Sequence, residues 1–155
     1  MPKQYIVANY MQSDVNTISE HSTVREVVEE MIKAHTNGLV VVDKQHKVVG
    51  MLSSWDIIAY VVPDYLEEDK HLAAFESGDV FAERIKEVEN HHVSKFMSTH
   101  VHTTKASHTL MEAATLLSEF HIRQLPVVDD NGVLVGYLNR TDLKRAIGDV
   151  LGLQE

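Results

Sequence analysis

The segment GMLSSWD, residues 50–56, returns 86 positions later as GYLNRTD, residues 136–142. The same offset aligns residues 7–62 with residues 93–148 without a gap, and 15 of the 56 aligned pairs are identical. A solenoid needs roughly three or more stacked units, so two copies favour a closed pair whose members face each other across a pseudo-twofold axis.

Each copy predicts the same order of elements. Apolar residues recur at helical spacing within residues 24–31 and 110–117. Uninterrupted apolar runs at residues 39–42 and 125–128 are typical of strands covered on both faces. A short extended piece precedes each helix, and a second strand and a second helix follow each run. The predicted fold class is therefore α+β, with two β-α-β-β-α repeats.

The repeats leave residues 63–92 between them, opened by Pro63. This segment holds nine acidic and three basic residues, so most of the chain's net charge of −9 is concentrated there. We divide the chain into a first repeat at 1–62, an acidic insert at 63–92 that we expect to be helical, and a second repeat at 93–155. The insert is interpreted as a solvated surface, with a lid or a docking surface for a partner as the alternative.

The composition excludes several classes of protein. An acidic chain offers no general surface for nucleic acid, although one phosphorylated small molecule needs only a few local cations. The chain has no cysteine, which excludes disulfides and thiolate metal sites. No apolar run approaches the ~18 residues of a membrane helix, and the start of the chain does not read as a signal peptide. We predict a cytoplasmic protein that contacts neither nucleic acid nor membrane.

The repeat resembles the cystathionine-β-synthase (CBS) domain. The resemblance covers both copies and includes the openings at Met11 and Met97, the LPVVD run at 125–129 and the GMLSSWD segment at 50–56. It implies a regulatory module that binds AMP, ADP, ATP or a related adenosyl ligand in clefts between the repeats. It also implies a homodimer and a regulated protein partner, and it implies no catalysis.

The chemistry of the motif fits such a ligand. A carboxylate in the first turn of a helix, as at Asp56 and Asp142, can accept hydrogen bonds from the two hydroxyls of a ribose. The Ser53 hydroxyl near the same helix N-terminus suits a phosphate oxygen. By resemblance, the backbone at residues 16–18 and at Thr103 would contact the adenine edge, and Leu39, Val40, Leu125 and Pro126 would make apolar contact with the adenine face. The nucleotide-binding set implied in this way is Asn16, Thr17, Ile18, Gly38, Leu39, Val40, Ser53, Asp56, Thr103, Arg123, Gln124, Leu125, Pro126, Asn139, Arg140 and Asp142.

Two alternatives stay open for this motif. Ser-x-x-Asp is also a capping-box pattern, which has a purely structural role and can coexist with ligand binding. The copies also differ, because Asn139 stands where the first copy has Ser53. Arg123 and Arg140 have no cationic counterpart in the first copy, so they are candidate phosphate ligands.

Other chemistries receive less support. His100 and His102 have the spacing of a metal pair, but their counterparts are Asp14 and Asn16, so we predict no metal site and no cofactor. No Gly-x-Ser-x-Gly elbow, His-Glu-x-x-His motif or Gly-rich phosphate loop is present, so we predict that the chain is not an enzyme. The alternative to a sensor is a homodimeric scaffold without a physiological ligand in its clefts. The apolar second helices favour a dimer under either interpretation.

Overall fold

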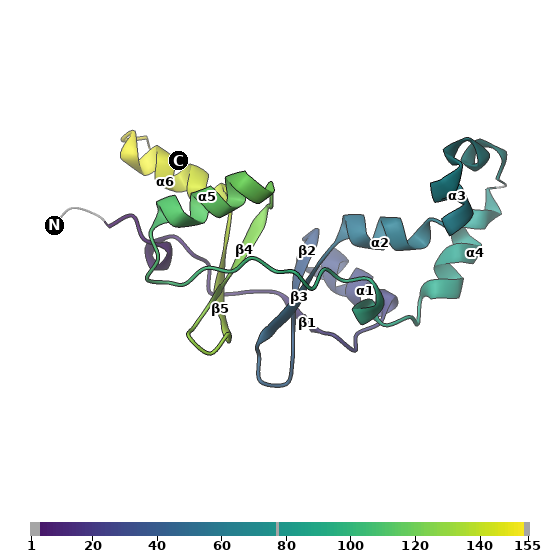
Figure 1. The fold of residues 1–155 in the computed structure, drawn as a ribbon, viewed down its shortest axis with the longest axis horizontal. Coiled ribbons are helices and arrows are strands. Elements are labelled where there is room, and N and C mark those ends of the chain that lie inside the picture. The colour runs from purple at the N-terminus through teal and green to yellow at the C-terminus, as the bar shows by residue number, and fades with distance from the viewer. Residues whose placement is uncertain (1–3, 77, 154–155) are drawn as a thin grey trace.

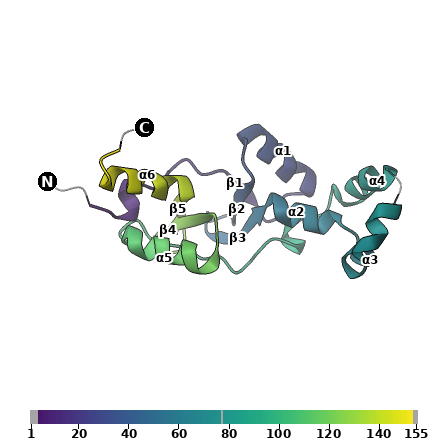
Figure 2. The same cartoon turned by 90° about the horizontal axis from the view of Figure 1, so that it is seen from above.

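Each repeat folds into a small β-sheet with helices packed against it, and the two units lie side by side along the long axis of the molecule (Figures 1 and 2). The structure is a computed structural model that describes residues 4–76 and 78–153. The first unit contains β1 (Thr17–Ser19), α1 (Val24–Ala34), β2 (Gly38–Val42), β3 (Val48–Ser53) and α2 (Ser54–Val61). The second contains α5 (Leu110–Phe120), β4 (Gln124–Val128), β5 (Leu134–Asn139) and α6 (Arg140–Val150). Short 3₁₀ turns, η1 (Val7–Asn9) and η3 (Val93–Lys95), open the repeats.

The first repeat has the predicted β-α-β-β-α order, and the second has lost its first strand. In the first sheet β1 runs parallel to β2, which pairs antiparallel with β3. In the second sheet β4 pairs only with β5, and a single parallel bridge from Thr104 to Val127 stands where Ile18 pairs with Val41 in the first. The difference arises because Ile18 packs against the first core, whereas its counterpart Thr104 is a polar threonine.

The described residues of the insert are largely helical. They form α3 (Asp64–Glu68), the 3₁₀ helix η2 (Lys70–Phe75) and α4 (Asp79–Val88). In both views α3 and α4 extend beyond α2 at the end of the molecule away from the second repeat (Figures 1 and 2). Arg84 joins α4 to the end of α2, because its guanidinium donates hydrogen bonds to the carbonyl oxygens of Val61 at 2.9 Å and Tyr60 at 3.1 Å.

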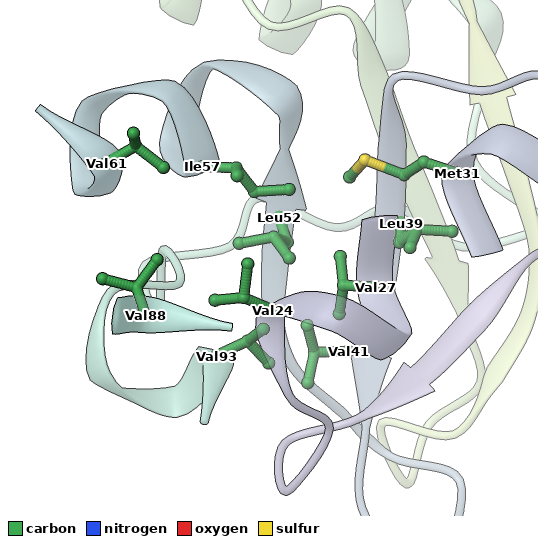
Figure 3. Packing of buried hydrophobic residues seen from close by; sticks show 10 residues of the cluster. All are labelled: Val24, Val27, Met31, Leu39, Val41, Leu52, Ile57, Val61, Val88 and Val93. Atoms are coloured by element: carbon green, nitrogen blue, oxygen red, sulfur yellow. The ribbon is translucent and has the colours of Figure 1, made fainter. Parts of the chain in front are cut away.

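Each repeat has its own hydrophobic core, and each core takes residues from outside the predicted boundaries. The first core is built on α1, β2, β3 and α2 and includes Val88 and Val93, which are fully buried (Figure 3). The second core includes Val7 and Tyr10, which are also buried. The segment that opens each repeat therefore packs into the other repeat.

The backbone repeats this exchange in both directions. The Val93 amide donates to the carbonyl of Ser22 at 2.9 Å, and the Val7 amide donates to the carbonyl of His108 at 2.9 Å. Val93 and Val7 are counterparts in the repeat, as are His108 and Ser22. The exchange is therefore symmetric, and a cut at residue 62 or 92 removes part of a core.

Val88 provides a test of where the insert ends. We expect Val88→Ala to lower the free energy of unfolding by about 2 kcal/mol, because it removes two buried methyl groups and leaves a cavity. Phe81→Ala on the same helix is the control, since that side chain is 71% exposed. Urea denaturation of both variants makes the comparison. Equal, small effects would mean that α4 belongs entirely to the insert.

In the part of the chain that the structure describes, no helix combines the length and the apolar character needed to cross a membrane.

Candidate functional site

A cleft of about 520 Å³ opens between the two repeats. Its walls come from the α1–β2 loop and the β3–α2 junction of the first repeat, and from residues 98–102 and 122–124 of the second. Pockets of roughly 300–1,000 Å³ are typical of small-molecule sites. Five residues of the predicted binding set line this cleft: Gly38, Ser53, Asp56, Arg123 and Gln124.

Asp56 and Ser53 line the cleft and also cap α2. The Asp56 carboxylate accepts hydrogen bonds through Oδ2 from the Ser53 amide at 2.8 Å and the Ser53 hydroxyl at 3.1 Å. The Asp56 amide donates to Ser53 Oγ at 3.3 Å, which completes a capping box. Among the residues that the structure describes, Oδ1 of Asp56 accepts no hydrogen bond. The capping role thus uses one carboxylate oxygen and leaves the other able to accept from a ligand hydroxyl.

The glycine of the motif is required by the segment that crosses it from the other repeat. Ser98 and Met51 exchange two backbone hydrogen bonds, at 2.9 and 3.0 Å. A Cβ atom on Gly50 would lie 3.1 Å from the Ser98 carbonyl oxygen and 2.8 Å from the sulfur of Met97. At Gly136 the equivalent Cβ would lie 2.6 Å from the carbonyl oxygen of Gln12. Both repeats therefore need glycine for close backbone approach.

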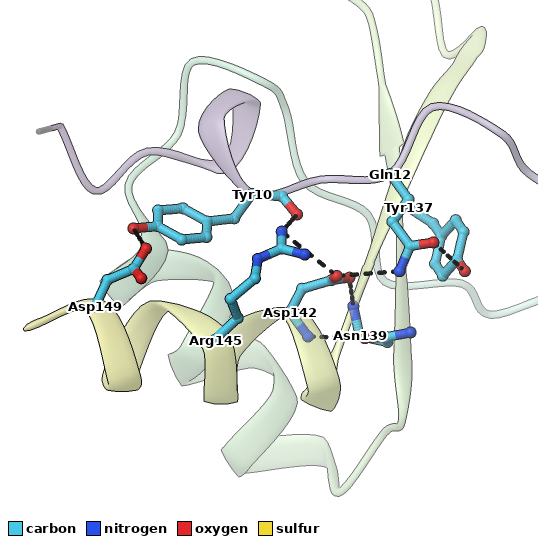
Figure 4. Close-up of polar contacts among 7 residues, drawn as sticks. All are labelled: Tyr10, Gln12, Tyr137, Asn139, Asp142, Arg145 and Asp149. Carbon is cyan, nitrogen blue, oxygen red and sulfur yellow. Dashed lines mark hydrogen bonds and ion pairs between the residues drawn. The ribbon is translucent and has the colours of Figure 1, made fainter. Parts of the chain in front are cut away.

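The second motif is arranged differently, and Asp142 does not line a cleft. Its side chain is buried, and its Oδ1 accepts a hydrogen bond from the Gln12 amide at 3.0 Å (Figure 4). Its Oδ2 accepts a hydrogen bond from the backbone amide of Asn139 at 2.9 Å, and a guanidinium nitrogen of Arg145 lies 3.8 Å from Oδ1. The sequence predicts that Asp142 accepts hydrogen bonds from a ribose, but in the structure its carboxylate contacts these protein groups instead.

Tyr137 lies beside this buried carboxylate. Its hydroxyl donates to Oε1 of Gln12 at 2.9 Å. Burial, together with the negative charges of Asp142 and Asp14, raises the pKa of the Tyr137 hydroxyl above its ordinary value of 10.0. The hydroxyl therefore stays protonated near neutral pH and remains a donor to Gln12.

Other residues of the predicted binding set also lie outside the large cleft. Leu39 and Leu125 were expected to contact an adenine face, but both are buried in the hydrophobic cores, Leu39 on β2 and Leu125 on β4. Asn16 and Val40 line a separate cavity of about 20 Å³. Thr103 and Arg140 are exposed outside both cavities, and the remaining predicted residues outside the large cleft are Thr17, Ile18, Pro126 and Asn139.

The cleft contains residues that the sequence analysis did not place there. His100 and His102 line it, and the His102 ring stacks on Phe120 with centroids 3.8 Å apart. Trp55 lines it too, and its side chain is 66% exposed. The sequence alone does not show that residues 98–102 cross to the other repeat, and this crossing brings the two histidines into the cleft. Within residues 4–76 and 78–153, no group of three or more histidines and carboxylates is arranged to hold a metal ion.

Comparison with known proteins identifies one family. A family model described as the CBS domain matches residues 7–63 and 93–149. The chain is 25% identical over 142 residues to a homoserine O-acetyltransferase of Methanococcus vannielii, covering 92% of this chain. The chain spans only 25% of the length of that relative.

A plant relative matches over a larger share of its length. The chain is 26% identical to the chloroplastic CBS domain-containing protein CBSX2 of Arabidopsis thaliana, covering 92% of this chain and 63% of the relative. The crystal structure of CBSX2 in complex with AMP superposes with a TM-score of 0.72 at 26% identity, covering 94% of this chain and 98% of the other.

Proposed function

The chain belongs to the CBS domain family, and on that basis we propose that it is a regulatory module that binds an adenine nucleotide or a related adenosyl ligand. The observation that carries the proposal is the 520 Å³ cleft, which is lined by Asp56 and Ser53 of one repeat and by Arg123 of the other. The AMP complex of CBSX2, which is 26% identical to this chain, supports the choice of ligand class.

Each part of such a ligand has a matching group in the cleft. Asp56 Oδ1 would accept from the ribose hydroxyls, because a carboxylate is an acceptor only. The Ser53 hydroxyl would turn its proton from Asp56 Oδ2 to a phosphate oxygen, and the start of α2 would favour the same phosphate. Arg123 is the arginine of the cleft lining, and its guanidinium suits bidentate phosphate recognition. Ligand binding therefore joins groups from both repeats, which is the physical basis for a regulatory response.

A ligand screen tests this proposal. We expect AMP, ADP or ATP to raise the unfolding temperature of the protein, since a ligand that binds only the folded state stabilises it. S-adenosylmethionine serves as the adenosyl comparison without phosphate. Mass spectrometry of small molecules released from the purified protein would identify a ligand that co-purifies. The proposal fails if none of these compounds shifts the transition and calorimetry detects no binding.

We propose no catalytic role for the chain. The cleft would hold a regulatory ligand rather than a cofactor, and the response would pass to a protein partner. The cytoplasmic location also stays a prediction, since the plant relative CBSX2 is named as chloroplastic.

A homodimeric scaffold is the second candidate, favoured by exposed apolar side chains on α2 and α6. Trp55 and Ile58 are 66% and 53% exposed, and Ile147 and Val150 are 60% and 64% exposed. Exposed apolar side chains of this kind on a helix mark an interaction surface. Under this candidate the protein dimerises but binds no adenosyl ligand.

The dimer is tested by charge substitution. We expect the wild type to sediment at twice the 17.5 kDa chain mass. Ile58→Glu combined with Ile147→Glu should shift it to the monomer, because a buried unpaired carboxylate opposes association. Ile32→Glu on α1 is the control, since that residue is 70% exposed outside these helices. A monomeric wild type at micromolar concentration would contradict the dimer.

A further inference from the structure

The molecule contains a second cleft that is built like the first but is almost filled. Its remaining cavity is about 20 Å³, against about 520 Å³ for the first. Val15, Asn16, Gln124 and Tyr137 line the small cavity, and they are the repeat counterparts of Val101, His102, Gly38 and Met51 in the large one. A cavity of this size holds about one water molecule, whereas a nucleotide needs several hundred Å³.

Two side chains that are larger in the second cleft lie where the segment from the other repeat crosses the motif. Gln12 stands where the first cleft has Ser98, and Tyr137 stands where it has Met51. Both pairs sit at the same place in the fold, because Gln12 and Tyr137 exchange backbone hydrogen bonds at 2.9 and 2.8 Å, as Ser98 and Met51 do. The longer Gln12 side chain then reaches Asp142 and the Tyr137 hydroxyl (Figure 4).

The Gln12 amide makes the kind of contact that a ligand would make. Its Nε2 donates to Asp142 Oδ1 at 3.0 Å, while its Oε1 accepts from Tyr137 at 2.9 Å. In the first cleft, Oδ1 of Asp56 accepts no hydrogen bond from the described residues. A ribose hydroxyl would also present a donor to such an oxygen. Gln12 therefore donates to Asp142 the hydrogen bond that a ligand hydroxyl could donate to Asp56.

We propose that Gln12 closes the second cleft from within, so that the protein binds a single adenosyl ligand per chain, in the first cleft. The inference rests on the proposed function, because it concerns the same ligand class. It assigns Gln12 and Tyr137 as the residues that decide how many sites the pair offers. The second cleft is then a latent site.

Exchanging the counterpart residues between the clefts tests the inference. AMP is titrated by isothermal calorimetry into the wild type, into the opened variant Gln12→Ser with Tyr137→Met, and into the closed variant Ser98→Gln with Met51→Tyr. We expect a single AMP per chain for the wild type and a second AMP for the opened variant. The closed variant should lose binding. Circular dichroism and the unfolding temperature show whether each variant is folded.

The outcomes separate this inference from the proposed function. Two AMP molecules bound to the wild type would overturn the inference and leave the proposed function intact. A folded opened variant that still binds one AMP would also overturn it. If the opened variant does not fold, a folded closed variant that binds AMP like the wild type would overturn it. If the wild type binds no adenosyl compound, the proposed function fails and this inference fails with it.

Discussion

Asp142→Ala is expected to lower the free energy of unfolding by about 3 kcal/mol, the largest loss we predict for a single side chain of the motif. Asp142 is completely buried, and its carboxylate accepts hydrogen bonds from Gln12 and from the backbone of Asn139. Hydrogen bonds to charged groups contribute about 1.5–3 kcal/mol, and their removal leaves buried donors without a partner. For a chain of 155 residues such a loss lowers the melting temperature by roughly 6–12 °C. Urea denaturation and calorimetry measure both quantities.

Asp56→Ala is the matched control, because the two carboxylates hold the same position in the repeat. Asp56 is only partly buried, and its hydrogen bonds are those of the capping box with Ser53. Loss of a helix cap costs about 1 kcal/mol. If the two alanine variants lose the same free energy of unfolding, the hydrogen bond from Gln12 does not contribute to the stabilisation by Asp142.

Asp56→Asn is expected to weaken AMP binding by roughly tenfold to a hundredfold. The ribose hydroxyls would lose their charged acceptor, which is worth about 1.5–3 kcal/mol, and this converts to that range of affinity. Asparagine keeps the size of the side chain and much of its capping ability, so the protein should stay folded. Isothermal calorimetry with AMP measures the change, and circular dichroism confirms the fold.

Asp142→Asn separates ligand binding from helix capping in this experiment. Its carboxylate already has protein partners, so we expect AMP affinity to stay within about twofold of the wild type. The two asparagine variants should therefore have opposite profiles, with Asp56 controlling affinity and Asp142 controlling stability. If Asp142→Asn weakens binding as much as Asp56→Asn, the second cleft takes part in recognition.

The repeat made most of the fold predictable. An offset shared by 56 positions carries the pattern of helices and strands from one half to the other, and the family match over both copies confirms it. The Ser-x-x-Asp pattern predicted the capping box that Ser53 and Asp56 form, whereas the ligand contacts of these two residues stay a prediction.

The remaining features depend on contacts between distant residues. Gln12 lies 130 positions from Asp142, and nothing in its neighbourhood in the sequence indicates that it reaches a buried carboxylate. His100 and His102 were judged as metal ligands against their own counterparts, whereas their position in the cleft follows from the crossing of their segment to the other repeat. The equivalence of the two copies predicted the secondary structure well, but it did not predict that the two clefts differ in volume.

The exchanged opening segments also have a consequence for cooperativity. If one repeat unfolded alone, it would pull Val93 or Val7 out of the core of its neighbour, so partial unfolding would expose apolar surface in both halves. The pair should therefore unfold in one transition, and amides in the two cores should exchange with deuterium at similar rates. A fragment that begins at residue 13 and ends at residue 98 keeps Val88 and Val93 with the first core, and it is the better candidate for an autonomous half than one cut at the ends of the repeat.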